Sequence, residues 1–419
     1  MKRTELFVKT RKEVPADETA RNAQLLIRAG YIHKEMAGVY SYLPLGKIVI
    51  DKISQIIREE MDNIGGNEVL MSTLQNKELW EATNRWDDKE VDNWFKSKLA
   101  SGAEVGIGFT HEEPLTNALK HFVSSYKDLP AYPYQIQTKF RNELRAKSGL
   151  LRGREFLMKD LYSYSRNQKE HDNFYEKVAS AYGKIFTRLG FPAGITYRTF
   201  ASGGVFSQFS DEFQVLSHIG EDTIYVDKAK KTAVNQEVYT DEVLAKLGLD
   251  KANMAEEKAV EVGNIFSLGT KYSDALGLYF TDENGQKQPI IMGCYGIGVS
   301  RLMGLIAEHF ADDKGLAWPG SVAPAIVYLV SLGNEPETRA AADELYHQLT
   351  AAGVGVIYDN RDGRAGEMFA DADLMGMPVR LVVSAKTLAE NSFELKERSS
   401  ESTKLISREN VIDIIANGA

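Results

Sequence analysis

The segment from Lys139 to Asp160, KFRNELRAKSGLLRGREFLMKD, brings several lysines and arginines together with acidic and aromatic side chains. Its pattern predicts an antiparallel hairpin, with a strand ending at Arg141, a long basic loop, and a returning strand from Arg154 onward. A guanidinium, a carboxylate such as Glu143 and an aromatic face such as Phe156 can together hold a phosphate, an adenine amino group and an adenine ring. Taken alone, the segment also fits an exposed hairpin with scattered, solvated charge.

A second segment, from Met292 to Phe310, reads MGCYGIGVSRLMGLIAEHF. An apolar, glycine-rich strand runs into apolar residues at helical spacing, which predicts a strand-to-helix turn. The glycines allow close approach of the backbone, and the start of the helix favours anions, to which Arg301 adds a full positive charge. The turn lacks both the dinucleotide-binding pattern G-x-G-x-x-G and the G-K-[ST] of a Walker loop. On its own it fits a packing turn as well as a ligand site.

Together the two segments resemble motifs 2 and 3 of the class II aminoacyl-tRNA synthetases. F-R-N-E followed by R-E-F matches the second motif, and G-I-G-V-S-R matches the third. The pattern is most similar to the bacterial type of prolyl-tRNA synthetase, and the resemblance covers about residues 15–227 and 259–417. Further signatures of that family are T-H-E-E at Thr110–Glu113, Y-Q-I-Q-T-K-F at Tyr134–Phe140, D-E-F-Q-V-L at Asp211–Leu216 and L-G-T-K-Y-S at Leu268–Ser273.

The resemblance implies a proline–tRNA ligase, in which ATP and proline form prolyl-adenylate and the prolyl group then passes to tRNA(Pro). It implies ATP as a substrate, Mg²⁺ as the metal, and proline and tRNA(Pro) as partners. Two alternatives stay open: the same chemistry on another small amino acid, and a catalytically silent, synthetase-like protein that binds tRNA. Arg141, Glu143, Phe156 and Arg301 are all present, which favours an active enzyme.

By this resemblance Arg141 and Arg301 are the catalytic residues. Arg141 would bridge the substrate carboxylate and the α-phosphate, since a planar guanidinium holds two oxygens at once. Arg301 would cover the other face of the adenine ring and reach the γ-phosphate. Glu212 and Gln214 share one strand face, and Glu212 is the candidate ligand of Mg²⁺, with a purely structural role as its alternative. The implied ATP site comprises Arg141, Glu143, Arg152, Phe156, Glu212, Gln214 and Arg301.

The returning strand of the basic hairpin has two faces with different side chains. Alternation places Phe156 and Asp160 on one face, and Glu155 and Lys159 on the other. Only one face can meet a ligand, and we expect it to be the face of Phe156.

The proline site implied by the resemblance comprises Thr110, Glu112, Arg141, Gly204 and Cys294. A prolinium nitrogen has two N–H bonds, which one carboxylate and one hydroxyl or carbonyl acceptor satisfy. Thr110 and Glu112 supply such a pair. His111 lies between them and points the other way in an extended loop, so we expect a structural role for it. Cys294 is expected to be a small buried thiol without reactivity.

Strands outnumber the helices between them up to about residue 320, and several are joined as hairpins. This favours an α+β fold with a mostly antiparallel sheet flanked by helices, as in the class II synthetases, formed by residues 1–227 and 262–320. Strands and helices then alternate, which predicts a separate α/β domain with a mixed sheet over residues 321–419. That domain resembles the anticodon-binding domain of class II enzymes.

A charged loop in the C-terminal domain, Asp359–Arg364, follows a predicted strand. Arg361 and Arg364 are placed to reach bases or phosphates of single-stranded RNA, and Phe369 to stack on a base. A charged surface loop without an RNA contact is the alternative.

The predicted helix from Ile48 to Met61, followed by a strand from Asn67 to Thr73, corresponds to motif 1. In this family motif 1 builds the homodimer interface, so a homodimer is expected. The family usually has a proline where this chain has Ser72, and the resemblance is weaker there.

Residues 228–261 are rich in Lys, Glu, Asp and Ala and are expected to form a short linker or subdomain. Many bacterial relatives carry a large editing domain at this place. A segment so short cannot hold a hydrolytic pocket with a core of its own. We therefore expect a short form that lacks the editing domain.

The composition sets outer bounds on function. A net charge of −9 argues against general coating of nucleic acid, although a local basic stripe can still bind RNA. The single cysteine excludes an intramolecular disulfide and a multi-cysteine zinc site, so no zinc is expected. No apolar run is long enough to span a bilayer, and the N-terminus has no secretory signal, which makes a cytoplasmic location the expectation.

Overall fold

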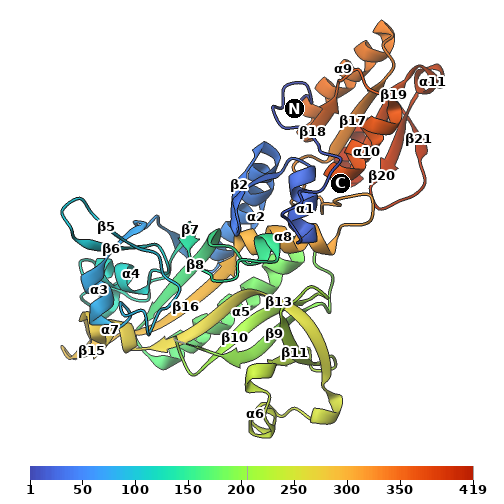
Figure 1. Cartoon of the computed structure of the whole chain (residues 1–419). Helices are drawn as coiled ribbons and strands as arrows, with labels where there is room; N and C mark the ends of the chain where they lie inside the picture. Colours follow the sequence, from blue (N-terminus) through green and yellow to red (C-terminus); the bar gives the residue numbers. More distant parts are fainter. Residues whose placement is uncertain (205, 419) are drawn as a thin grey trace. The chain divides into compact units, whose positions relative to one another are not determined.

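The computed structural model describes residues 1–204 and 206–418, and the chain forms two compact units (Figure 1). The large-sheet unit consists of Ser54–Ala146 and Gly153–Leu302. The composite unit consists of Met1–Ile53, Lys147–Arg152 and the chain from Met303 onward. These limits differ from the predicted domains, because the N-terminal part of the chain packs with the C-terminal part. Ala419, where the predicted C-terminal domain ends, lies outside the described residues.

The large-sheet unit is built on nine strands in the order β10-β9-β12-β11-β13-β16-β8-β7-β3. The pairs β12–β9 and β3–β7 are parallel, and the other neighbours are antiparallel. The predicted α+β fold with a mostly antiparallel sheet is therefore confirmed. The strands are β3 (Asn67–Glu68), β7 (Pro133–Phe140), β8 (Glu155–Ser165), β9 (Thr196–Ser202), β10 (Phe209–Leu216), β11 (Asp222–Asp227), β12 (Thr232–Asn235), β13 (Ala255–Gly269) and β16 (Ile291–Gly298).

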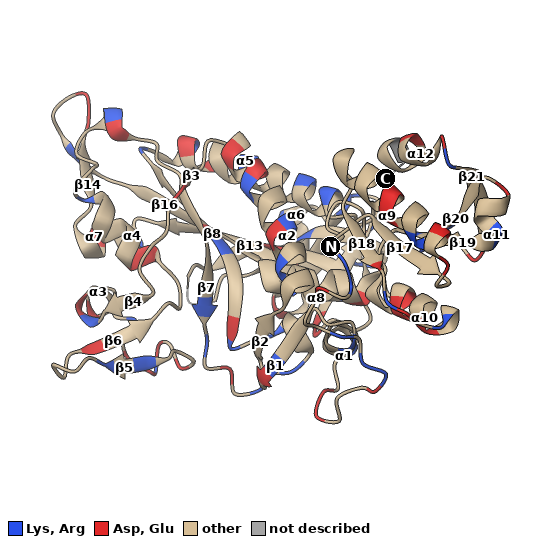
Figure 2. Cartoon of the chain, turned by 90° about the horizontal axis from the view of Figure 1, so that it is seen from above, with Lys and Arg blue, Asp and Glu red and all other residues tan. Residues whose placement is uncertain are grey.

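Helix α5 (Gln168–Arg188) packs against β8, β13 and β16 and covers one face of this sheet. Its first turn is capped by Asn167, whose side chain accepts a hydrogen bond from the Glu170 amide at 3.0 Å. Buried side chains such as Phe174 and Tyr182 form its apolar stripe. Its solvent side carries interleaved Lys/Arg and Asp/Glu (Figure 2). The helix thereby covers one face of the sheet, and the opposite face is free of α5.

The motif 1 helix is found as α2 (Pro44–Asn63), which confirms the predicted helix. The strand expected after it is shorter, because β3 ends at Glu68. The Val69 amide still donates to the Tyr134 carbonyl at 2.7 Å, but Met71 bonds to side chains of β7: Gln135 accepts from the Met71 amide at 3.0 Å, and Gln137 donates to the Met71 carbonyl. Side-chain amides thus take the place of a continued strand ladder.

Smaller elements complete the large-sheet unit. The segment expected to be a linker or subdomain contributes β12, α6 and the beginning of β13, and both strands lie inside the sheet rather than at its edges. The remaining elements are the sheet β4-β6-β5 (Leu74–Asn76, Glu104–Ile107, Lys96–Lys98), the hairpin β14-β15 (Tyr279–Thr281, Lys287–Pro289), and the helices α3 (Lys77–Ala82), α4 (Glu112–Leu119), α6 (Asp241–Leu247) and α7 (Lys271–Leu276).

The composite unit contains a five-stranded sheet in the order β18-β17-β19-β20-β21. Strand β17 is parallel to β18 and β19, while β20 and β21 are antiparallel to their neighbours, so the predicted mixed sheet is confirmed. Its C-terminal elements are β17 (Val327–Leu332), α9 (Pro336–Ala351), β18 (Val356–Asp359), α10 (Ala365–Met375), β19 (Val379–Ser384), α11 (Ala385–Ala389), β20 (Ser392–Glu397), β21 (Lys404–Ser407) and α12 (Val411–Gly418).

The N-terminal part of the composite unit holds helix α1 (Arg21–Arg28) and the hairpin of β1 (Ile32–Met36) and β2 (Val39–Tyr42). The glycine-rich strand β16 is followed by helix α8 (Val299–His309), as the sequence predicts. None of the helices in the described ranges combines the length and apolar character that crossing a membrane requires.

Candidate active site

The predicted basic hairpin is formed by β7 and β8, in which Lys139 pairs with Phe156. As the loop begins, the Arg141 amide donates a hydrogen bond to the Arg154 carbonyl at 2.9 Å, which keeps the two chains together. The hairpin prediction is confirmed. Arg152 belongs to the composite unit, so its place beside the other predicted ATP ligands stays a prediction.

Arg141 is half-buried at the base of the hairpin, and its guanidinium lies over two aromatic rings. The Cζ atom is 5.1 Å from the ring centre of Phe109 and 5.4 Å from that of Phe156. Its Nε atom is shielded from solvent and has no hydrogen-bond partner among the described residues. Removal from water, together with the charge of Arg301, lowers the pKa of Arg141. A guanidinium held in this way is suited to an anionic ligand.

Arg301 lies in the first turn of α8 and is held by Glu261 on β13. Its Nη1 atom donates to the Glu261 carbonyl at 2.6 Å and lies 3.2 Å from Oε2 of the same residue. Glu261 was not predicted from the sequence, because it lies in the segment expected to be a linker or subdomain. The signal that marks it is E-V-G-N at Glu261–Asn264, where polar and apolar residues alternate as in a strand.

Glu143, predicted to hold the adenine amino group, is anchored by Asn93 from outside the hairpin and by Arg154 from within it. Its Oε1 atom lies 3.5 Å from Nδ2 of Asn93, and its carbonyl accepts from Nε of Arg154 at 3.0 Å. The neighbouring Asn142 amide donates to the Asn93 carbonyl at 2.6 Å. Asn93 therefore holds the start of the basic loop, a role that nothing in its local sequence indicates.

Glu212 and Gln214 lie on the same face of β10, as predicted, and belong to a connected polar group. Gln214 donates to Glu212 and to Asp222, each at 2.9 Å, and Asn235 donates to Glu212 at 3.0 Å. Burial, with the nearby charge of Glu261, raises the pKa of Glu212 to about 8, and burial raises that of Asp222. Carboxylates that resist ionisation in this way are suited to a cation or to sugar hydroxyls.

A metal site is not preformed here. Across residues 1–204 and 206–418 no three His, Cys, Asp or Glu side chains cluster in a way that could hold a metal ion. Magnesium needs only one or two carboxylates when phosphates supply further ligands. The side chains around Glu212 fit that requirement, and the magnesium assignment stays a prediction.

Thr110 and Glu112, predicted to bind proline, are buried and hydrogen-bonded to each other. The Thr110 hydroxyl donates to the Glu112 carboxylate at 2.7 Å and lies 3.3 Å from the hydroxyl of Tyr162. Cys294 is buried on β16, and burial, with the charge of Glu112, raises the pKa of its thiol well above the ordinary value. The thiol is therefore protonated at neutral pH, in keeping with the expectation of an unreactive cysteine.

Gly204, the fifth predicted proline-site residue, lies in a tight loop between β9 and β10. Its φ angle of +54° is in the left-handed region that favours glycine. At Gly203 an added Cβ atom would lie 2.2 Å from the Ser207 carbonyl oxygen, so that position has no room for a side chain. The two glycines set the shape of the loop.

Arg85 is a buried cation beside the predicted proline site that the sequence analysis did not identify. Its Nη1 atom lies 2.9 Å from Glu113 and 3.4 Å from Glu112. Its guanidinium lies 4.8 Å from the ring centre of Trp80 and 5.1 Å from that of Phe206. A single arginine between two tryptophans in W-E-A-T-N-R-W is the sequence signal, and it is too weak to identify such a residue in advance.

The two predicted faces of β8 are confirmed by their contacts. Lys159 lies on the α5 side, where its Nζ donates to the Tyr182 hydroxyl at 2.6 Å and to the Tyr295 carbonyl at 2.9 Å. Asp160 lies on the other side, where it forms an ion pair with Lys139 at 2.9 Å. Phe156 shares the face of Asp160, which is the face of the candidate site.

His111 is part of the buried row that includes Lys139 and Asp160. Its Nδ1 atom accepts from the Lys139 ammonium at 2.8 Å, and its Nε2 atom donates to the Ser72 carbonyl at 3.0 Å. Burial and the charge of Lys139 lower the pKa of His111 to about 4. The ring is therefore neutral at physiological pH and joins the Ser72 segment to β7, in keeping with the expected structural role.

We expect acidification to destabilise the fold through His111. Its pKa of about 4 when folded lies below the unfolded value of 6.5, so the unfolded chain binds a proton first as the pH falls. This contribution is complete above pH 6.5 and is lost toward pH 4, which amounts to about 2 kcal/mol between pH 7 and 5. Urea unfolding at both pH values, for the parent and His111→Gln, measures it. An equal loss in both proteins would contradict the assignment.

The three residues predicted to contact tRNA have different surroundings in the composite unit. Arg361 donates to Asp359 and Asp371, each at 2.7 Å. Arg364 is exposed at the start of α10. The ring of Phe369 is covered by the guanidinium of Arg380, which lies 4.0 Å from the ring centre. Arg364 is thus the most available of the three, and the RNA contacts themselves stay predictions.

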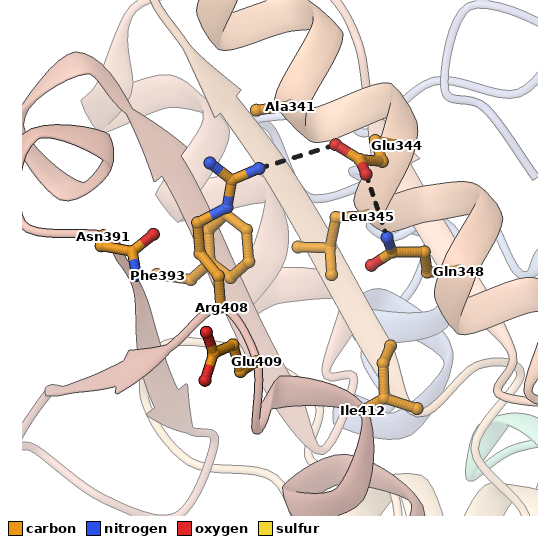
Figure 3. A pocket seen from close by; sticks show the side chains of 9 residues that line it. All are labelled: Ala341, Glu344, Leu345, Gln348, Asn391, Phe393, Arg408, Glu409 and Ile412. Carbon is orange, nitrogen blue, oxygen red and sulfur yellow. Dashed lines mark hydrogen bonds and ion pairs between the residues drawn. The ribbon is translucent and has the colours of Figure 1, made fainter.

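A hollow of about 370 Å³ lies on the other side of the same domain, between α9, β20 and the start of α12. Figure 3 shows Arg408 over the ring of Phe393, with its guanidinium directed toward Glu344 at 3.6 Å. Nothing in the sequence analysis pointed to this hollow. It is lined by Ala341, Glu344, Leu345, Gln348, Asn391, Phe393, Arg408, Glu409 and Ile412.

Comparisons with known protein families match both parts of the chain. The family described as tRNA synthetase class II core domain (G, H, P, S and T) matches residues 94–310. The family described as anticodon binding domain matches residues 326–418. Together with the antiparallel sheet and the arginines of its two motifs, these matches define a class II aminoacyl-tRNA synthetase.

Similarity over the whole chain shows to which family within that class the chain belongs. A proline–tRNA ligase of Maricaulis maris is 37% identical over 100% of this chain and 99% of its own length, and one of Rhizorhabdus wittichii is 39% identical over 98% of each. A proline–tRNA ligase of Geobacillus sp. WCH70 is 34% identical to this chain, and the alignment extends over 567 positions. Because this chain has 419 residues, that relative carries additional sequence. The chain belongs to the proline–tRNA ligase family.

Solved structures agree in fold. The prolyl-tRNA synthetase of Cryptosporidium parvum complexed with L-proline and AMP has a TM-score of 0.75 at 17% identity, over 95% of this chain and 75% of that one. Its complex with halofuginone and AMPPNP has a TM-score of 0.77.

Proposed function

We propose that this enzyme activates proline with ATP and transfers it to tRNA(Pro). The observation that carries this function is full-length similarity to proline–tRNA ligases, combined with Arg141 beside Phe156 and a buried Thr110–Glu112 pair. In the first step the proline carboxylate attacks the α-phosphorus of ATP and pyrophosphate leaves. In the second a ribose hydroxyl of the tRNA 3′ end attacks the carbonyl of the adenylate, and AMP leaves.

The roles follow from the charges that the site holds. Arg141 lies between the predicted proline and adenine contacts, where a guanidinium can bind both the carboxylate and the α-phosphate. Arg301, fixed by Glu261, would neutralise the γ-phosphate, and Arg152 would add charge from the basic loop. Glu212 and Gln214 would hold the ribose, or a magnesium ion, which would supply charge to offset that of the phosphates.

The proline site would use buried side chains from β16, from the first residue of α4 and from the chain just before it, with the loop between β9 and β10. Glu112 and Thr110 would accept the two N–H bonds of the prolinium nitrogen, and Gly204 and Cys294 would bound the ring. Arg85 lies 2.9 Å from Glu113 and 3.4 Å from Glu112, so it would hold both carboxylates in place at the substrate site.

The wider assignments are also proposals. Residues 1–227 and 262–320 form the catalytic domain, and residues 321–419 bind the anticodon through Arg361, Arg364 and Phe369. A homodimer forms through the motif 1 region, and the enzyme acts in the cytoplasm. The family match to an anticodon-binding domain over residues 326–418 supports the tRNA partner.

Proline-dependent ATP–pyrophosphate exchange is the experiment that tests this function. Exchange with proline well above that with alanine, glycine or serine is the expected result, followed by charging of tRNA(Pro). Stronger exchange with another small amino acid would favour the first alternative function. No exchange with any amino acid, while tRNA still binds, would favour the catalytically silent alternative.

Replacing Glu112 by glutamine is expected to lower kcat/KM for proline by roughly 10- to 100-fold, because a charge-assisted hydrogen bond to the prolinium is lost. The KM for ATP, measured in the same exchange assay, should change little. Glu81→Gln is the matched control, since Glu81 is an exposed partner of Lys77 at 3.4 Å. An unchanged KM for proline in Glu112→Gln would remove this residue from the proline site.

A further inference from the structure

The N-terminal segment Met1–Thr10 begins beside the edge strand β18 of the five-stranded sheet, as the N-terminus beside β18 shows in Figures 1 and 2. The Tyr358 amide donates to the Met1 carbonyl at 2.9 Å, and the Arg3 amide donates to the Tyr358 carbonyl at 2.8 Å. Lys2 pairs with Tyr358 in the parallel sense. The segment therefore adds a short strand to an edge that would otherwise be open.

Thr4 continues this contact into the loop that follows β18. Its amide donates to Oδ1 of Asn360 at 3.2 Å, and Nδ2 of Asn360 donates to the Thr4 hydroxyl at 2.8 Å. The Asn360 carbonyl in turn accepts from Arg339 on α9 at 3.4 Å. Asn360 is thus held from two directions, and Arg361 is the next residue in the chain.

The same segment supplies charge to the loop. The carboxylate of Asp371 accepts from the Thr10 hydroxyl and from Arg361, each at 2.7 Å, and lies 3.6 Å from Nη2 of Arg3. Only 3% of the Arg3 side chain is exposed, so water screens its charge little. Two arginines, one of them from the N-terminal segment, balance the carboxylates of Asp359 and Asp371.

We propose that Arg3 and Thr4 are positioning residues for tRNA recognition, acting through the loop Asp359–Arg364. This inference rests on the proposed function and on the contact of that loop with tRNA. Thr4 holds the Asn360 side chain in place before RNA binds, which lowers the ordering cost of binding. Arg3 cancels a carboxylate that would otherwise repel the phosphates.

The test of Thr4 uses the full-length enzyme and removes one hydroxyl. Thr4→Val is expected to raise the KM for tRNA(Pro) by roughly three- to tenfold, with kcat and proline-dependent pyrophosphate exchange within twofold of the parent. Thr4→Ser, which keeps the hydroxyl, should restore the parent KM. Thr350→Val is the matched control, because the Thr350 hydroxyl bonds only to Tyr346 of its own helix, at 2.7 Å, in the described structure.

Arg3→Gln tests the charge. It should raise the KM for tRNA most at low ionic strength, since the uncompensated carboxylate is screened as salt is added. It should also lower the ratio of charging between tRNA(Pro) and a transcript with a replaced anticodon, because the loop is less well placed to discriminate.

The outcomes separate this inference from the function on which it rests. If the parent enzyme neither activates proline nor charges tRNA(Pro), the proposed function fails. If the parent is active and Thr4→Val keeps the parent KM for tRNA, the positioning role is wrong. It is also wrong if pyrophosphate exchange falls in parallel with charging, or if Thr4→Ser fails to restore the KM, because both results indicate general damage to the fold.

Discussion

Replacement of Arg141 by alanine is expected to reduce proline-dependent ATP–pyrophosphate exchange by on the order of 10³-fold or more. Its guanidinium lies over the rings of Phe109 and Phe156, and in the proposed function it binds both substrates. An interaction that strengthens as the pentavalent phosphorus forms lowers kcat when it is lost, rather than raising KM alone. Exchange kinetics at saturating ATP and proline measure this loss, and tRNA affinity should change little.

Two further variants make this result specific. Arg166→Ala removes an exposed arginine that precedes α5 and pairs with Glu170 in the first turn of that helix, at 2.7 Å. This variant should retain the parental rate of exchange. Arg141→Lys keeps the charge but loses the planar fork, and it should recover only a small part of the rate. Near-parental exchange by Arg141→Ala would contradict the catalytic role of Arg141.

Alanyl-tRNA(Pro) is the second expected result: the enzyme should make it and should not hydrolyse it. Alanine is smaller than proline and can enter the same site, and each lost methylene discriminates by only about 10- to 200-fold. The segment 228–261, where longer relatives are expected to carry an editing domain, is used here for β12, α6 and the start of β13. Its small apolar cluster includes Leu244 and Leu249, which pack on Val234 of the sheet.

Incubation of the enzyme with preformed alanyl-tRNA(Pro) tests this expectation directly. Deacylation should proceed at the rate of the enzyme-free control, while steady-state charging with alanine should be measurable at high concentration. Arg141→Ala serves as a second control, because it is expected to keep its tRNA affinity and to form little new adenylate. Deacylation that depends on enzyme and exceeds both controls would show that a hydrolytic site exists elsewhere in the chain.

The hairpin of β7 and β8 and the glycine-rich turn into α8 were predictable because their signals are local. Period-two alternation placed Phe156 and Asp160 opposite Lys159, and the contacts with Tyr182 and Lys139 confirm that assignment. Similarly, the apolar stripe of α2 is contained in one continuous stretch of sequence. Local periodicity decides such features with little help from the rest of the chain.

The partners of the site residues were not predictable, since they come from distant parts of the chain. Arg85 reaches Glu113, and Glu261 reaches Arg301, across 28 and 40 positions respectively. The motif 1 strand also ended early, because glutamine side chains of β7 replaced its backbone partners. Single-sequence patterns carry no information on which buried charge pairs with which, and the fold alone supplies it.

The N-terminal segment is the clearest case of this limit. Met1–Arg3 shows no alternation of polar and apolar residues, yet it pairs with β18 through backbone groups. Backbone hydrogen bonds to an edge strand are independent of side-chain type, so the sequence holds no signal for them.

Cys294 gives the enzyme a practical property. It is the one cysteine among the 419 residues, it is buried, and its thiol is protonated at neutral pH. Maleimide reagents attack the thiolate of an accessible cysteine, so they should leave the parent enzyme unlabelled. A cysteine introduced at an exposed position, such as Lys386 on α11, would then be the one residue that the fluorophore labels. Site-specific spectroscopy of tRNA binding would therefore not require that Cys294 be replaced first.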